Sequence, residues 1–193
     1  MHFKKAVNFI LNKQEKELPA HLAYHSIVHV MDVYNAAEQI GKHEGITTAD
    51  MKLLLTAAAY HDSGFIIEPK GHEEQSCLFA QQTLPDFGYS SADIEKICGM
   101  IRATRIPQSP TNYLEEIIAD ADLDYLGRDD FFTTGENLFN ELLTLGVVKN
   151  ENEWNNVQVR FMESHHYFTK TSVKLRKAKK QQHLKQVKIK LKN

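Results

Sequence analysis

Four side chains that suit a divalent metal ion stand well apart in the sequence: His29, His61, Asp62 and Asp122. Two imidazoles and two carboxylates together offer nitrogen and oxygen donors, which suit Mn, Fe, Co, Ni or Zn better than Ca. On an octahedral ion such a set leaves positions for water or a substrate oxygen. A metal that polarises water is therefore the chemistry that these residues first suggest.

The residues before His61 predict a helix that carries this side chain toward the core. Leu54, Ala57, Ala58 and His61 occur at i, i+3, i+4 and i+7, so they share one helix face. Asp62 follows about 100° further around, and both side chains can converge beside the helix end. Burial of these groups costs free energy unless they are paired. For an isolated His-Asp pair, a hydrogen bond between the two or an arginine partner is the usual way to stabilise the buried groups. Additional ligand-type side chains near the pair favour a bound metal instead.

The other two candidate ligands are expected on helices as well. His25 and His29 are four residues apart, which places them on one face of a predicted helix. Asp120 and Asp124 lie close enough to Asp122 to compete with it as the last ligand. Residues two apart on a helix point to different sides, so we expect only one of these three acids to bind the metal.

The pattern along the chain is nearly all helical, with no convincing strand pattern. Start signals at Thr47 and Ser90 precede apolar residues at helical spacing. Further helices are expected over residues 20–43, 51–61, 72–84, 112–126, 130–145, 153–168 and 170–192. A chain of 193 residues is enough for one substantial core and marginal for two. We therefore predict an all-α, single-domain helical bundle that spans residues 1–193.

Composition is that of an ordinary globular protein, with 42% hydrophobic and 25% charged residues. No stretch approaches the roughly 20 apolar residues that a membrane span requires, and the start does not read as a signal peptide. The two cysteines, Cys77 and Cys98, show no disulfide or metal spacing, and we expect them to be small buried apolar side chains. A cytoplasmic location is the expectation that follows.

Charge is distributed unevenly along the chain. Residues 164–193 contain ten Lys or Arg and no acid, whereas the other 163 residues carry 13 basic and 25 acidic side chains. This basic tail, concentrated in residues 170–193, could contact nucleic acid, but it lacks interleaved aromatic residues and an arginine cluster. We expect instead a terminal helix whose lysines face water and whose apolar positions lie against an acidic body: Leu175, Ala178, Leu184, Val187 and Leu191.

At the four candidate ligands the sequence resembles the HD superfamily of metal-dependent phosphohydrolases, whose pattern is a His, a His-Asp pair and a distant Asp. The segments YHSIVHV, AAAYHDSGF, GHEEQSCLFAQQTLPDFG and IIADADLDYLG carry the resemblance, which covers about residues 20–127. It implies an all-α domain in which the metal is held by His29, His61, Asp62 and Asp122. Residues 128–193 would add C-terminal helices.

The resemblance departs from those members that hold two metals, because they add further histidines before the last Asp. Only His72 occurs in that interval, and the stretch IRATRI offers Arg102 and Arg105 instead. We therefore expect one divalent ion (Mn, Fe, Ni, Co, Zn or Mg) and disfavour the cyclic-dinucleotide phosphodiesterase branch.

Roles for the remaining polar residues follow from metal-assisted hydrolysis. Candidates for orienting or deprotonating the water are Asp62, His72, Glu73 and Glu74. Candidates for contacting a substrate phosphate are His25, Arg102 and Arg105, and His25 could also support a ligand. The structural alternatives are solvated arginines and, for His72, a place at a helix start beside two acids that serve capping and dipole interactions. Other histidines are expected to be structural (His165, His166) or at the surface (His2, His21, His43, His183), and core anchors are expected at Trp154, Phe161 and Phe168.

These features predict a metal-dependent phosphohydrolase that acts on a small phosphorylated compound, most plausibly a nucleotide. The competing hypothesis is a noncatalytic regulatory or scaffold protein that keeps the metal for stability and uses the basic tail to contact a partner. A metal-dependent product from a panel of phosphate esters would separate the two. A metal-dependent oxygenase on a related helical fold would need more ligands than this sequence supplies.

Overall fold

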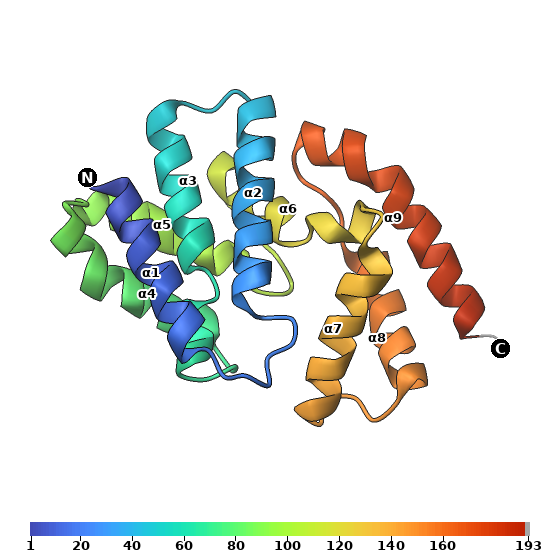
Figure 1. Ribbon diagram of the computed structural model, residues 1–193. Helices are drawn as coiled ribbons and strands as arrows, with labels where there is room; N and C mark the ends of the chain where they lie inside the picture. The colour runs from blue at the N-terminus through green and yellow to red at the C-terminus, as the bar shows by residue number, and fades with distance from the viewer. Residues whose placement is uncertain (192–193) are drawn as a thin grey trace.

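The computed structural model describes residues 1–191, and within them all regular structure is helical, as predicted (Figure 1). Short 3-10 helices η1 (Ser63–Ile66), η2 (Leu84–Phe87) and η3 (Asp124–Gly127) separate longer α-helices. The α-helices are α1 (Phe3–Glu17), α2 (Ile27–His43), α3 (Thr48–Tyr60), α4 (His72–Thr83), α5 (Ser91–Ala103), α6 (Tyr113–Asp122), α7 (Phe131–Thr144), α8 (Glu151–Ser164) and α9 (Lys170–Lys190).

The first six helices surround one large cluster of buried apolar side chains. Helix α3 is central, since it packs against α1, α2 and α5, and α2 also packs against α6. The face predicted to enter the core does so, because Leu54, Ala57 and Ala58 are fully buried. Helix α3 therefore fixes the position of its own C-terminal end, where His61 lies.

Helices α7 and α9 pack against η3, and α8 packs against α9. Together they form a second apolar cluster, which includes Tyr125, Phe131, Met162 and Val187. In Figure 1, α7, α8 and α9 lie on one side of α2 and α6, and α1, α3, α4 and α5 lie on the other. The buried apolar residues thus form two clusters within the helical bundle.

Local sequence signals set several helix ends. The Thr47 hydroxyl accepts a hydrogen bond from the amide of Asp50 at the start of α3. Ser90 and Asp93 form a reciprocal capping box at the start of α5. Both starts agree with the sequence prediction.

Four helices differ from the prediction. Helix α1 was not predicted at all. Helix α2 begins at Ile27 rather than at residue 20, so His25 precedes the helix and does not share a helix face with His29. Helix α6 ends at Asp122, four residues early, and α8 ends at Ser164 because His165 adopts an extended backbone conformation.

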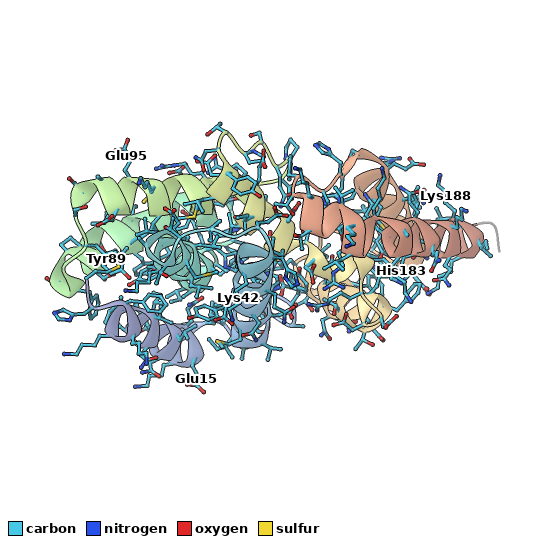
Figure 2. The ribbon with its side chains drawn as sticks, turned by 90° about the horizontal axis from the view of Figure 1, so that it is seen from above. Glu15, Lys42, Tyr89, Glu95, His183 and Lys188 are labelled. Atoms are coloured by element: carbon cyan, nitrogen blue, oxygen red, sulfur yellow. The ribbon has the colours of Figure 1, made fainter. Side chains whose placement is uncertain are left out.

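Helix α9, on which His183 and Lys188 are labelled in Figure 2, buries a different set of residues from the one predicted. Leu184 and Val187 are buried, but Leu175 is 50% exposed. The buried face includes two polar residues, Lys180 and His183. The placement of His183 at the surface was wrong, because its Nδ1 donates to the carbonyl oxygen of Leu126 at 2.9 Å and its ring stacks on Phe131.

Of the other expectations about the core, that for the cysteines agrees with the structure and that for the aromatic anchors agrees only in part. Cys77 and Cys98 are free and buried. Trp154 is buried, whereas Phe161 and Phe168 are half-buried. No helix in the described part of the chain has the length and apolarity needed to cross a membrane.

Candidate metal centre

Three helices and one short turn bring the four candidate ligands together. His29 lies in the first turn of α2, His61 is the C-cap of α3, Asp62 starts η1 and Asp122 ends α6. Because α2 packs against both α3 and α6, these element ends meet. The four side chains are separated in sequence but adjacent in space.

The two carboxylates each contact both imidazoles. Asp122 Oδ1 lies 3.2 Å from His29 Nε2 and 3.6 Å from His61 Nε2. Asp62 Oδ2 lies 3.5 Å from His29 Nε2 and 3.2 Å from His61 Nε2. Within residues 1–191, donor atoms of His29, His61 and Asp122 all lie within 4.8 Å of one another, a spacing that could hold a metal ion.

The hydrogen bonding of this cluster suits a bound cation. His61 Nδ1 donates to the carbonyl oxygen of Ala58 at 2.8 Å, which fixes this ring and directs Nε2 toward the carboxylates. His61 Nε2 and Asp62 Oδ2 are buried and have no hydrogen-bond partner. Buried polar atoms without a partner are costly. A divalent ion would satisfy both, so the residues present fit a metal.

Electrostatics keep the carboxylates in their anionic form. Burial opposes ionisation of Asp122, but a hydrogen bond from His29 and the nearby imidazole of His61 lower its pKa to about 2. The pKa of Asp62 is also lowered, against the cost of burial, by the charge of His61. Both carboxylates are therefore available as ligands at neutral pH.

The neighbouring acids of α6 and η3 have other partners. Asp120 accepts hydrogen bonds from the amides of Phe168 and Thr169 at 2.9 and 2.8 Å. Asp124 forms a pair of hydrogen bonds with the guanidinium of Arg176. Of the three acids considered as last ligand, Asp122 is the one that contacts the histidines.

His25 is held by Glu141, a residue of α7 that sequence reasoning missed. Glu141 is buried, and its Oε2 accepts hydrogen bonds from the amides of Tyr24 and His25 at 2.8 and 3.0 Å. Its Oε1 accepts a hydrogen bond from His25 Nδ1. Burial opposes the charged imidazole, yet this bond and nearby carboxylates raise the pKa of His25. The sequence does contain a signal for Glu141, because this acid occupies a position in the helical repeat where an apolar residue is expected, close to Leu138 and Leu142.

His72 lies on the other side of Asp62. Its Nε2 is 3.5 Å from Asp62 Oδ1 and 3.8 Å from Glu73 Oε1, and its Nδ1 donates to the carbonyl oxygen of Pro69. Phe65 stacks on both His72 and His25, with ring centroids 4.1 Å apart in each pair. Phe65 therefore sets the spacing of these two imidazoles, a role that the sequence did not suggest.

The two arginines are exposed and bind Glu74 rather than facing the ligands. Arg102 Nε lies 3.1 Å from both Glu74 carboxylate oxygens, and Arg105 donates to the same carboxylate at 2.9 Å. Arg105 Nε also lies 3.5 Å from Glu73 Oε2. Arg105 is thus connected to the site through Glu73, whereas Arg102 lines a separate hollow beside α5.

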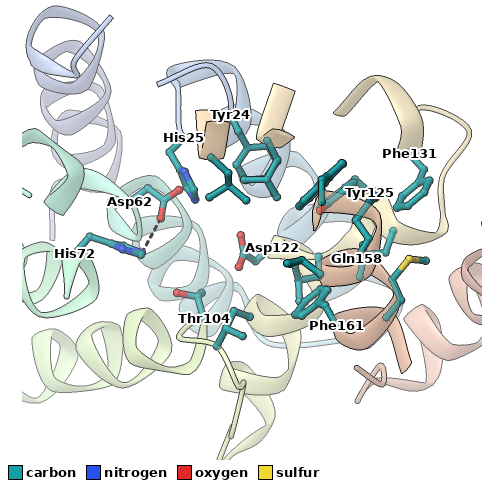
Figure 3. A pocket seen from close by; sticks show the side chains of 18 of the residues that line it. Tyr24, His25, Asp62, His72, Thr104, Asp122, Tyr125, Phe131, Gln158 and Phe161 are labelled. Atoms are coloured by element: carbon teal, nitrogen blue, oxygen red, sulfur yellow. Dashed lines mark ion pairs between the residues drawn. The ribbon is translucent and has the colours of Figure 1, made fainter. Parts of the chain in front are cut away.

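A cavity of about 370 Å³ opens beside the metal centre (Figure 3). Its charged end is formed by His25, Asp62, His72, Glu73 and Asp122. No lysine or arginine among the described residues lines it. The cavity therefore joins the carboxylates of the metal centre to a space large enough for a small organic molecule.

Comparison with known proteins places this geometry in a family. A model of the HD domain matches residues 27–125. Among solved structures, a predicted HD superfamily hydrolase from an uncultured Thermotogales bacterium is similar at 21% identity and a TM-score of 0.65, over 98% of this chain and 91% of that one. Bacillus subtilis YpgQ, solved in complex with ADP, gives 18% identity and a TM-score of 0.67 over 98% and 97% of the two chains.

A protein from Lactobacillus plantarum is similar to the same extent, with 16% identity and a TM-score of 0.67 over 98% of each chain. A search of curated proteins found no match. These structural likenesses extend through α7–α9 and show the shared fold, whereas the HD domain match covers more than half of the chain and contains all four candidate ligands. The chain belongs to the HD domain family.

Proposed function

We propose that this protein is a metal-dependent phosphohydrolase that cleaves a phosphate ester or anhydride of a small phosphorylated compound, most plausibly a nucleotide. The observation that carries the proposal is the pair of buried donors without partners, His61 Nε2 and Asp62 Oδ2, at the end of an open cavity. The ADP complex of Bacillus subtilis YpgQ, a structural neighbour, supports a nucleotide.

One divalent ion would be held by His29, His61, Asp62 and Asp122, and when bound it would supply an activated water and offset negative charge at phosphorus. Asp62 is positioned for two roles, because Oδ2 faces the histidine ligands while Oδ1 faces His72. A water between Asp62 Oδ1 and His72 Nε2 would be oriented by both, and either group could accept its proton.

The phosphate of the substrate would bind at the end of the cavity beside the metal centre, where the positively charged groups lie. Since no lysine or arginine lines the cavity in the described chain, His25 is the side chain there whose positive form is favoured, because Glu141 and nearby carboxylates raise its pKa against the cost of burial. Its Nδ1 is bonded to Glu141, so Nε2 is the atom free to donate to a phosphate oxygen.

The test is metal content by elemental analysis of untagged protein purified without chelator, with Asp122→Ala compared with Glu116→Ala on the same helix. We expect one metal ion per chain in the wild type and in Glu116→Ala, and loss of the metal in Asp122→Ala. The loaded wild type should then release phosphate or pyrophosphate from a panel of phosphate esters. Little metal after incubation with Mn, Fe, Ni or Zn would overturn the proposal, and bound metal without turnover would favour a regulatory protein.

A further inference from the structure

Beyond Asp122 the cavity changes character and becomes apolar (Figure 3). Helices α7 and α8 and the short helix η3 enclose this part, which we call the apolar chamber. The residues that define it are Tyr125, Phe131, Leu138, Leu142, Trp154 and Phe161. All the charged residues that line the cavity lie at the metal end, and the chamber has none among the described residues.

The chamber is too large to be a defect in packing. Protein interiors contain few voids larger than a water molecule, whereas the whole cavity measures about 370 Å³. It is also accessible, because Ile106 and Val157 line it and remain 52% and 43% exposed. An open apolar space of this size joined to a charged site is the usual form of a ligand pocket.

Few polar groups line this part of the cavity: the Tyr125 and Thr104 hydroxyls and the Gln158 amide. The Thr104 hydroxyl donates to the carbonyl oxygen of Ile101 at 2.8 Å. The Gln158 amide donates to Asn155 Oδ1 at 3.2 Å. A ligand in the chamber would therefore be selected by its size, flatness and apolar surface more than by polar groups on its edge.

We infer that the apolar chamber binds the organic group of the phosphorylated substrate, and that this group is flat and largely apolar. The inference rests on the proposed function, which puts the phosphate between His25 and the metal centre. A nucleobase and a simple aryl group share this chemistry. Small polar esters such as glycerol phosphate would leave the chamber filled with water and would be poor substrates.

The test compares ligands that cannot be hydrolysed, so that binding is measured apart from turnover. Metal-loaded protein is titrated by calorimetry with phenylphosphonate, methylphosphonate and α,β-methylene-ADP. Burial of a phenyl ring predicts that phenylphosphonate binds roughly ten- to a hundredfold more tightly than methylphosphonate. Trp154 is the single tryptophan of the chain and lines the chamber, so its emission should change with phenylphosphonate and not with methylphosphonate.

Titration with α,β-methylene-ADP distinguishes a nucleobase from a simple aryl group as the occupant of the chamber. Tighter binding of α,β-methylene-ADP than of phenylphosphonate, with the same change in Trp154 emission, supports a nucleobase in the chamber. Tight binding of phenylphosphonate alone supports a simple aryl ester. Equal affinity of phenylphosphonate and methylphosphonate would overturn the inference, while metal content and hydrolysis of the ester panel would still decide the proposed function separately.

Matched variants locate the binding. Leu142→Trp fills the chamber, and Leu143→Trp is the control on the same helix because Leu143 is 42% exposed and does not line the cavity. We expect Leu142→Trp to abolish the preference for phenylphosphonate without changing metal content, and Leu143→Trp to keep it. Val157→Trp narrows the chamber from an exposed position, so the test does not depend on the folding of Leu142→Trp. An unchanged preference in folded Leu142→Trp and Val157→Trp would refute the assignment.

Discussion

Replacement of Glu141 should separate the stability of this protein from the chemistry of His25. The carboxylate is buried and accepts three hydrogen bonds, two from the amides of Tyr24 and His25 and one from His25 Nδ1. In Glu141→Ala these donors lose their partner, at an expected cost of about 3 to 5 kcal/mol in the free energy of unfolding. Such a loss is a large fraction of the roughly 5 to 15 kcal/mol that stabilises a typical domain.

The conservative variant Glu141→Gln distinguishes two functions of the side chain. Its amide oxygen can replace Oε2 and keep both backbone hydrogen bonds, so the expected cost is only about 1 to 2 kcal/mol. Its amide nitrogen would replace Oε1 and meet His25 Nδ1, which must then accept rather than donate. The imidazole can no longer be held as a cation, and we expect kcat/KM to fall roughly tenfold or more.

The pH dependence of this pair has a definite sign. The pKa of His25 is raised above 6.5, so its contribution is complete below pH 6.5 and is lost as pH rises through the folded-state value. The pKa of Glu141 is lowered below 4.5, despite the cost of burial, by its hydrogen bond with His25, so its contribution is complete above pH 4.5 and is lost as pH falls. The difference between wild type and Glu141→Ala should therefore be greatest between pH 4.5 and 6.5.

Urea unfolding at pH 6 and pH 9 measures the difference, with Glu136→Ala, an exposed acid on the same helix, as the control. The control should stay within about 0.5 kcal/mol of the wild type. A Glu141→Ala variant as stable as Glu136→Ala at both pH values would refute the reasoning, as would full activity in Glu141→Gln.

Two further substitutions test the packing around the site and in α9. Gly64→Ala places a Cβ 1.9 Å from the carbonyl oxygen of His72, so η1 and α4 must move apart; urea unfolding should show a loss of about 2 kcal/mol or more, with reduced phosphate release. Lys180 is buried, and burial lowers its pKa from 10.5 to about 8, so Lys180→Met should stabilise the protein by up to about 3 kcal/mol at pH 7. Because the wild type gains stability as pH rises from 8 to 10.5, this advantage should shrink at pH 10, and a pH-independent difference would contradict the prediction.

The helices that could be predicted are those whose apolar residues repeat within the segment itself. Helix α3 carries Leu54, Ala57 and Ala58 on its buried face, and Thr47 marks its start. Helix α1 carries the same kind of signal, because Ala6, Val7 and Ile10 recur at helical spacing and are buried against α3. It was not predicted, although its pattern of apolar residues is present in the sequence.

In residues 20–26, hydrogen bonds to a residue distant in sequence prevent the helix that the local spacing predicts. The spacing of His25 and His29 suits a helix, but the amides of Tyr24 and His25 bind Glu141, more than a hundred positions later in the chain. Those amides are therefore not available to a helix that starts at residue 20. His183 is a similar case, because its partner, the carbonyl of Leu126, is brought near by the packing of α9 on η3.

The candidate metal ligands were accessible from sequence because their residue types and order are specific, although the clustering itself depends on the ends of α2, α3 and α6. Glu141 and Phe65 were not accessible, since each acts through residues that only the folded chain brings near. The apolar chamber was not accessible either. Trp154 and Phe161 were expected to be core anchors, and they instead line a space that the core leaves open.

The candidate metal ligands and the apolar chamber come from different parts of the chain, so the specificity for the substrate can change independently of the metal centre. The HD domain match ends at residue 125, and it contains the four candidate metal ligands. Glu141 and five of the six residues that define the apolar chamber come from α7 and α8, beyond residue 125, and His25 precedes residue 27. Substitutions in α7 and α8 can therefore reshape the space for the organic group without disturbing the donors on α2, α3 and α6. Variation at Leu138, Leu142 and Trp154 should thus alter the relative affinity for phenylphosphonate and methylphosphonate while leaving metal content unchanged.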